Sequence, residues 1–278
     1  MDKVLLSIGH GYCAQALARR LLPNGWKVFG TTRSPGNSKS MIADGVEPII
    51  WPGDELPMAD ASHILTSVAP SDRKDPVLAK ETEAFKGASH LNWVGYLSTT
   101  GVYGDHSGGW VDEMTPPAPT TERGIARVAA ESEWQTLGLP LQIFRLAGIY
   151  GPGRGPLEKV RQGSARRIIK KGQVFSRAHV EDIAQVLEAS IGAPIPGAIY
   201  NICDDDPAPP EDVIAFAAEL LGLPIPPEVD FEDADLSPMA RSFYAESKRV
   251  RNDRIKSELG VVLKYPDYRS GLRALLSA

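Results

Sequence analysis

An apolar run near the amino terminus leads directly into a glycine-containing turn and then into a helical pattern. The run Val4–Ile8 predicts a buried strand. The turn has glycine at its first and third positions and a small residue at its sixth, in the order Gly9, His10, Gly11, Tyr12, Cys13, Ala14. Apolar residues then recur at helical spacing until Pro23-Asn24-Gly25 ends the pattern. A strand, a tight turn and a helix in this order favour a parallel sheet covered by helices.

The same turn predicts a dinucleotide site. Gly9 permits the tight turn, Gly11 lets a pyrophosphate approach the backbone, and Ala14 allows close packing of helix and strand. The helix amino terminus, including Tyr12 and Cys13, offers N–H donors and the positive end of the helix dipole to phosphates. His10 and Cys13 are interpreted as neighbours of the phosphates rather than as reactive groups. A tight turn without a ligand is the alternative.

The end of the second expected strand, 27–31, predicts which dinucleotide binds. An NAD-preferring fold usually has an acidic residue here, which binds the ribose 2′-hydroxyl. This chain has Thr32, Arg33 and Ser34 instead, and an arginine suits a 2′-phosphate. We therefore expect NADP(H) rather than NAD(H), the alternative being an exposed loop arginine. Ser67, near the end of a further expected strand at 63–68, completes the candidate cofactor residues.

Short apolar runs alternate with helical patterns over the first half of the chain. Further strands are expected at 48–51, 93–98, 141–146 and 199–202, which gives an α/β fold with a Rossmann-type, doubly wound parallel sheet. We expect residues 1–150 and about 178–203 to form the dinucleotide-binding domain. Residues of about 151–177 and 204–278 would form a smaller substrate lobe.

Composition excludes several classes of function. The 278 residues carry a net charge of −5, which argues against a general nucleic-acid binder. Two cysteines, with no metal-ligand spacing, fit a reducing compartment and predict no metal site. No apolar run approaches the roughly 18 residues that a membrane span needs, and the amino terminus lacks the apolar core of a signal peptide. We expect a cytoplasmic monomer or homodimer that binds a small molecule, and neither nucleic acid nor membrane.

Several motifs occur in a specific order along the chain. They are YLSTTGVYGD at 96–105, FRLAGIYGPGR at 144–154, RAHVEDIAQV at 177–186, IYNICDD at 199–205 and SKRVRNDRIKSELG at 247–260. With them the chain resembles the extended short-chain dehydrogenase/reductase superfamily, the NAD-dependent epimerase/dehydratase group. That resemblance implies a Rossmann domain, a small carboxyl-terminal substrate lobe, and a catalytic Ser or Thr together with a Tyr-x-x-x-Lys pair.

The resemblance implies that Thr99 is the catalytic hydroxyl, the alternative being a strand-end threonine bonded only to backbone. Aligned on Glu131, the lysine position falls on Arg127 and the tyrosine position on Arg123, which is typical of atypical members of the superfamily. An arginine cannot shuttle protons at neutral pH. Arg127 would instead hold ribose hydroxyls, and Arg123 would bind an anionic substrate group or the cofactor. A solvated helix face is the alternative for both.

Basic residues are concentrated at 153–179, where related folds build the substrate cleft. Arg154 and Arg177 are the candidates for binding a phosphate- or carboxylate-bearing ligand, with a solvated turn as the alternative. His179 and Asp182 are interpreted as structural, and Asp182 fits helix capping and dipole compensation.

Together these features predict an NADP(H)-dependent oxidoreductase or epimerase-like protein acting on a small polar substrate, with an anionic group favoured. A catalytically inactive NADP(H)-binding sensor or regulatory protein is the alternative.

Overall fold

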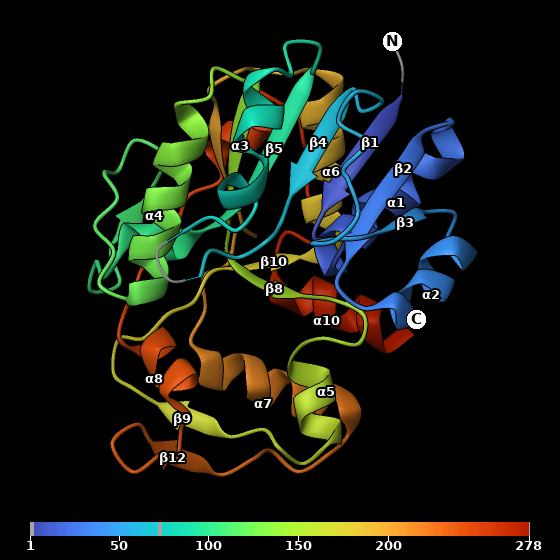
Figure 1. Cartoon of the computed structure of the whole chain (residues 1–278). Coiled ribbons are helices and arrows are strands. Elements are labelled where there is room, and N and C mark those ends of the chain that lie inside the picture. The colour runs from blue at the N-terminus through green and yellow to red at the C-terminus, as the bar shows by residue number, and fades with distance from the viewer. Residues whose placement is uncertain (1–2, 72–73, 278) are drawn as a thin grey trace.

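The central feature of the computed structural model, which describes residues 3–71 and 74–277, is a seven-stranded parallel sheet (Figure 1). Its spatial order is β11-β7-β5-β4-β1-β2-β3, so the direction of winding changes between β1 and β4. The strands are β1 (Val4–Ile8), β2 (Lys27–Thr32), β3 (Glu47–Ile50), β4 (His63–Thr66), β5 (Trp93–Thr99), β7 (Leu141–Leu146) and β11 (Ile199–Ile202). This confirms the predicted α/β fold with a Rossmann-type sheet.

Two strands differ slightly from expectation at their ends. Strand β3 begins and ends one residue earlier than the expected range 48–51. Strand β4 ends at Thr66 rather than at Val68. Ser67 still donates its N–H to the Ile8 carbonyl, but its side chain turns to the Gly9 carbonyl. The chain leaves the sheet there because a polar contact with the glycine turn replaces the next rung of strand pairing.

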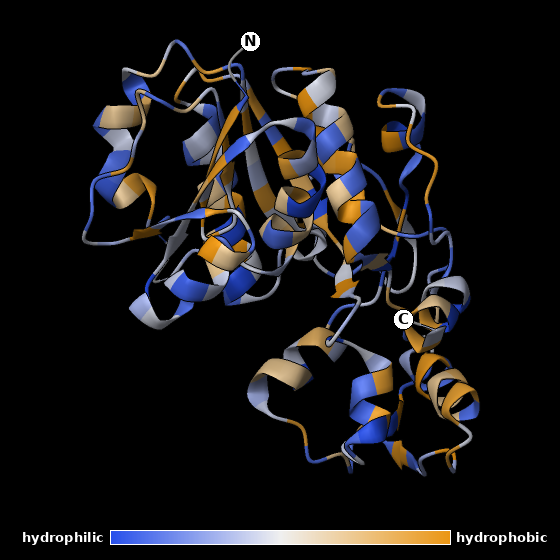
Figure 2. Ribbon diagram, turned by 90° about the vertical axis from the view of Figure 1, so that its right-hand side faces the viewer, coloured by the Kyte–Doolittle hydropathy of each residue, from blue (hydrophilic) through white to orange (hydrophobic). Residues whose placement is uncertain are grey.

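Helices cover both faces of the sheet. On one face α1 (Tyr12–Leu21) and α6 (Val180–Gly192) pack together over a core that includes Leu17 and Ile183. On the other face α3 (Leu78–Lys86) and α4 (Glu122–Gln135) bury Phe85 and Trp134 edge to face, with ring centroids 4.8 Å apart. Helices in Figure 2 carry both orange and blue segments along their length, as amphipathic helices on a sheet do.

A smaller group of elements lies below the carboxyl ends of the strands (Figure 1). It contains α5 (Pro156–Arg161), β9 (Arg167–Ile169), α7 (Pro210–Leu221), β12 (Glu228–Asp230) and α8 (Pro238–Tyr244). Leu157, Val213 and Leu272 belong to its own hydrophobic core. Ile255 and Val261 belong to the core beneath α1 and α6. The division of the chain into domain and lobe stays a prediction.

Short elements complete the chain. They are the 3-10 turns Leu22–Asn24, Pro35–Asn37 and Thr100–Tyr103, the helices α2 (Ser38–Ala43), α9 (Asp253–Ser257) and α10 (Tyr268–Ser277), and the strands β6 (Trp110–Val111), β8 (Gly148–Tyr150), β10 (Arg177–His179) and β13 (Arg249–Val250). Strand β8 pairs with β10, and β6 with β13. Within the described ranges no helix is both long enough and apolar enough to cross a membrane.

A buried ion pair ties α4 to the sheet. Arg145 on β7 and Glu131 on α4 are both almost fully buried, with Nη2 and Oε2 2.7 Å apart. Ser98 on β5 donates its hydroxyl to the same carboxylate. Arg145 Nη1 also donates to the Tyr103 hydroxyl over 3.1 Å, which in turn donates to Asn201 Oδ1 over 2.7 Å. This network fixes the position of α4, and with it the residues one turn before Glu131.

Candidate functional site

The glycine turn is held from two neighbouring strands. Gly9 N–H donates to Thr31 Oγ1 over 2.7 Å, His10 N–H donates to the Thr31 carbonyl over 3.1 Å, and Ser67 Oγ donates to the Gly9 carbonyl. Gly9 has a φ of +81°, and a Cβ there would lie 2.9 Å from Val68 Cγ2. Only glycine fits this position. The turn is therefore rigid before any ligand arrives.

Helix α1 begins at this turn without a cap. Gly11 is its N-cap residue, no side chain caps it, and its first turn contains no acidic residue. The first N–H groups of a helix have no intrahelical acceptor and need another. A Cβ at Gly11 would meet only the Gly9 carbonyl, at 3.8 Å, so the space in front of the helix is open to a ligand.

The side chains in the turn add no charge. Burial lowers the pKa of His10 to about 4 and raises the pKa of Cys13 to about 11, so both are neutral at pH 7. His10 Nδ1 lies 3.1 Å from Ser7 Oγ. The attraction for an anion therefore comes from the backbone N–H groups and the helix dipole.

The structure brings Arg154 next to this turn. Tyr12 donates its hydroxyl to the Pro152 carbonyl over 2.9 Å, and the Arg154 guanidinium lies 5.5 Å from the Tyr12 ring centroid. Two backbone hydrogen bonds between Gly151 and Arg154 close the loop. Arg154, expected at the substrate, thus lies within reach of the start of α1, and its expected role stays a prediction.

The end of β2 presents an exposed cation. Thr32 Oγ1 accepts hydrogen bonds from Ser34 N–H over 3.2 Å and from Asn37 Nδ2 over 3.3 Å, which shapes the loop around Arg33. Arg33 is exposed and forms no ion pair with any described carboxylate. Asp54, after β3, accepts from Ile50 N–H over 3.0 Å and closes its own turn. The loop therefore offers one unpaired guanidinium beside the expected ribose position.

Thr99 and Arg127 lie on neighbouring elements at the end of β5. Thr99 Oγ1 accepts a hydrogen bond from Gly101 N–H over 3.1 Å. Arg127 Nη1 donates to the Leu97 carbonyl over 2.7 Å and to the Tyr96 hydroxyl over 3.2 Å. Arg127 Nε is buried and has no partner among the described residues. The structure thus places Arg127 against the strand two residues before Thr99.

Arg123 points toward the lobe. Its guanidinium carbon lies 4.3 Å from the centroid of the Phe243 ring on α8. Burial and, next, the charge of Arg127 lower the pKa of Arg123. The two arginines therefore share one side of α4, with Arg127 directed to the sheet and Arg123 to the lobe.

Arg177 lies inside the protein. It is 9% exposed, and its Nη1 donates to the Phe175 and Ala208 carbonyls. Its expected role in substrate binding stays a prediction. Nearby, His179 rather than Asp182 caps α6, because His179 Nδ1 accepts from Glu181 N–H. Asp182 instead accepts from Lys264 and Tyr265 N–H and ties down the carboxyl-terminal segment.

Asp204 is a buried carboxyl that sequence reasoning did not single out. It is 2% exposed, and neither carboxylate oxygen has a partner of good hydrogen-bond geometry among the described residues. Burial raises its pKa well above the usual range, while the positive charge of Arg177 acts in the opposite direction. The folded protein therefore binds a proton at Asp204 more tightly than the unfolded chain does.

Replacing Asp204 with asparagine should change the pH dependence of stability. Because the pKa is raised on folding, the wild type loses stability as pH rises above the unfolded value of about 3.9. We expect the free energy of unfolding of Asp204→Asn, relative to that of the wild type, to increase as pH rises above about 4, so that the variant becomes relatively more stable. Urea denaturation at several pH values measures it, with the exposed Asp60→Asn as control. A relative loss at high pH would show that the Arg177 pairing dominates.

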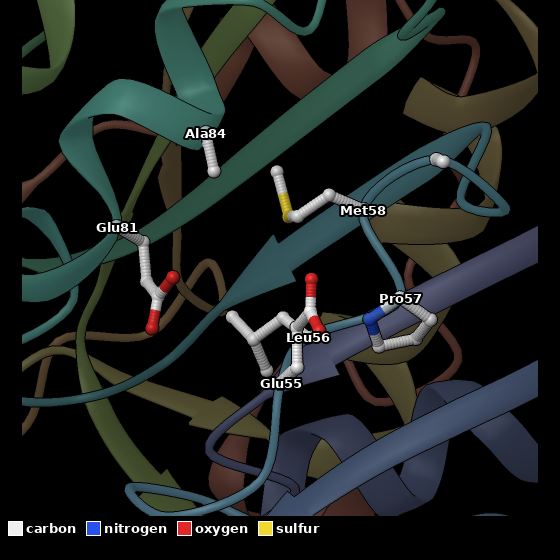
Figure 3. Close-up of a pocket in the computed structure, with 7 residues that line it drawn as sticks. Glu55, Leu56, Pro57, Met58, Glu81 and Ala84 are labelled. Atoms are coloured by element: carbon white, nitrogen blue, oxygen red, sulfur yellow. The ribbon is translucent and has the colours of Figure 1, made fainter.

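One pocket lies away from these residues. It has a volume of about 450 Å³ and is lined by Glu55, Leu56, Pro57, Met58, Ala59, Glu81 and Ala84 (Figure 3). Trp51 Nε1 donates to Glu81 over 2.8 Å at its edge. Two carboxylates disfavour a phosphate there, so this pocket does not compete with the glycine turn as the phosphate site.

Sequence reasoning missed Thr31, Tyr96 and Phe243. Thr31 had a usable signal, because a threonine at the end of the strand beside β1 faces the glycine turn. Tyr96 and Phe243 had none, since both act through contacts between elements that are distant in the sequence.

Comparison with known proteins identifies the family. No family model matches the chain. It is 30% identical to Protein YeeZ of Escherichia coli strain K12 over 286 residues, which cover 96% of this chain and 97% of YeeZ. The chain belongs to the YeeZ family. A conserved protein of unknown function from Silicibacter pomeroyi is 61% identical, with a TM-score of 0.96, over 99% of this chain and 98% of that one.

More distant structures place the family in a superfamily. A Methylobacillus flagellatus protein assigned as an NAD-dependent epimerase/dehydratase is 28% identical, with a TM-score of 0.73, over 100% of this chain and 98% of that one. UDP-glucuronic acid 4-epimerase from Bacillus cereus in complex with NAD shares the fold. It is 18% identical, with a TM-score of 0.77, over 99% of this chain and 97% of that one. Human epimerase family protein SDR39U1 in complex with NADPH also shares the fold. It is 17% identical, with a TM-score of 0.74, and the match covers 99% of each chain. The family is part of the extended short-chain dehydrogenase/reductase superfamily, as the motifs predicted.

Proposed function

We propose that this protein binds NADP(H) at the glycine turn and acts as a reductase or epimerase-like enzyme on a small polar, anionic substrate. The observation that carries the proposal is the start of α1, where a rigid turn presents uncapped N–H groups to open space. Those donors fit a pyrophosphate. Membership of the extended superfamily, and the NAD and NADPH complexes of two structures with this fold, support the proposal.

Within this proposal Arg33 selects the phosphorylated dinucleotide. Its exposed guanidinium follows β2, where an NAD-specific fold would have an acid, and no described carboxylate pairs with it. Ser34 and Thr32 would contribute hydroxyl groups beside it. A 2′-phosphate would supply the counter-charge that the loop lacks.

Arg33→Ala should weaken NADPH binding by about 10- to 150-fold, the loss of one charge-assisted contact. NADH binding should change by less than about twofold, because NADH has no group at that position. Titration followed by the fluorescence of the reduced nicotinamide measures both. Lys39→Ala removes a nearby exposed charge and should leave the preference intact. Equal or tighter binding of NADH by the wild type would refute NADP(H) specificity.

The residues at the end of β5 define the proposed chemistry. A bound nicotinamide would supply hydride transfer at its C4. Because Gly101 donates to Thr99 Oγ1, the hydroxyl hydrogen of Thr99 can be donated to a substrate carbonyl. Arg127 is held against β5 and would stabilise ribose hydroxyls or developing negative charge. Since neither arginine carries protons at neutral pH, the proton would come from water or from the substrate.

The arginine pair also favours a second candidate, an inactive NADP(H)-binding sensor or regulatory protein. Incubation with NADPH and a panel of aldehydes, ketones and sugar nucleotides separates the two, with oxidation followed by nicotinamide absorbance. Turnover that Thr99→Val abolishes would support the enzyme. Tight NADPH binding without turnover, and a protein partner captured only in the presence of NADPH, would support the sensor.

A further inference from the structure

The side of α4 that carries Arg123 and Arg127 has an excess of positive charge. Neither guanidinium forms an ion pair with a carboxylate in the described part of the chain. The acid whose charge acts on Arg123 is Glu246. Glu246 is already engaged, because its Oε2 lies 2.7 Å from Lys248 Nζ and its Oε1 accepts from Thr120 over 2.8 Å. Arg127 is half-buried, and a half-buried charge without a partner is costly, so an anionic ligand fits here.

Arg127 is oriented in advance. The Leu97 carbonyl and the Tyr96 hydroxyl both accept from Nη1, and the guanidinium lies 5.5 Å from the Tyr96 ring centroid. Only Nη1 is used in this way, and Nε is buried without a described partner, so Nη2 is the nitrogen left to bind a ligand. Nη2 of Arg127 and the guanidinium of Arg123 can each donate to one oxygen of a carboxylate.

Aromatic side chains face these charges from the lobe. Phe243 is 45% exposed although its ring lies against Arg123. Behind it Tyr244 contacts Phe175 and Phe231, with both pairs of ring centroids 5.4 Å apart. Helix α8, which carries Phe243 and Tyr244, lies below α4 in Figure 1. An exposed ring beside an unpaired guanidinium suits a flat, unsaturated body that carries an acid.

We propose that the substrate is a planar aromatic carboxylate, whose carboxylate is bound by Arg123 and Arg127 and whose ring packs against Phe243. The proposal rests on the proposed function, since it names the substrate class of the same site. It places the ligand on Arg127, which contacts β5 at Leu97, two residues before Thr99. A phosphate ester would use the same charge but has no flat ring to pack against the exposed Phe243.

Binding of benzoate by the whole protein, measured by isothermal titration calorimetry and by ligand-observed NMR, tests the proposal without any dinucleotide. We expect benzoate to bind, and cyclohexanecarboxylate and inorganic phosphate to bind at least about threefold more weakly. Arg127→Gln and Arg123→Gln should each weaken benzoate binding by about tenfold or more. Phe243→Leu should weaken benzoate binding by about threefold to tenfold, with little effect on cyclohexanecarboxylate.

Arg273→Gln is the matched control, because Arg273 is also exposed and lies over a phenylalanine, Phe216, at 5.3 Å. It should leave benzoate binding unchanged. Arg123 is exposed, so its variant should fold even if Arg127→Gln does not. No benzoate binding, equal binding by the Arg123 variant, or tighter binding of phosphate would each overturn the proposal. NADPH binding without benzoate binding defeats this inference alone, whereas benzoate binding without NADPH binding defeats the proposed function.

Discussion

Arg145→Met is expected to lower the free energy of unfolding by roughly 3–5 kcal/mol. The substitution leaves the Glu131 carboxylate buried and without its counter-charge, although the ion pair is 2.7 Å long in the native protein. It also removes the donor to the Tyr103 hydroxyl, which connects the pair to Asn201 on β11. Denaturation in urea, followed by circular dichroism, measures the loss.

The double variant Arg145→Met, Glu131→Leu separates charge from packing. Replacing both partners with apolar side chains removes the unpaired charge, so it should recover much of the lost stability. The exposed pair of Lys86 with Glu83 offers a control, because breaking a surface ion pair costs at most about 1 kcal/mol. A loss below about 1 kcal/mol for Arg145→Met would mean that water reaches and solvates Glu131.

Gly11→Asp is expected to abolish dinucleotide binding while leaving the fold intact or slightly more stable. Gly11 is the N-cap of α1, its φ is −98°, and a Cβ there meets nothing closer than 3.8 Å. Aspartate is among the best N-cap residues, so its carboxylate should take the free N–H groups of the helix. A pyrophosphate would then lose those donors and meet a like charge. The loss of two charge-assisted contacts predicts binding weaker by more than about 100-fold.

Two control variants test whether the added charge at the start of α1 causes the loss of NADPH binding. Gly192→Asp adds the same charge at the far end of α6, in open space, and should leave NADPH binding unchanged. Gly11→Ala adds bulk without charge and should weaken binding less than Gly11→Asp does. Thermal denaturation verifies that each variant folds. If Gly11→Asp binds NADPH with wild-type affinity, the start of α1 is not the phosphate site.

The sequence predicted the sheet and its glycine turn correctly because both depend on local patterns. Apolar runs gave the strands, and Gly9 could be recognised because its backbone conformation has a positive φ that other residues avoid. The superfamily motifs were also local and kept their order. By the same reasoning Arg33 and Gly11 could be named as cofactor residues, and both remain predictions that the experiments above test.

What the sequence alone determined, then, is the fold and the place of the glycine turn, since strand and helix periodicity and glycine conformation act over a few neighbouring residues. Only the tertiary structure decided how the arginines are used. It put Arg177 in the interior, Arg154 beside Tyr12, Arg127 on the Leu97 carbonyl and Arg123 on Phe243. The sequence around an arginine in a helix or loop does not indicate which group its side chain will contact. Its partner, and therefore the charge it has left for a ligand, depends on elements that only folding brings together.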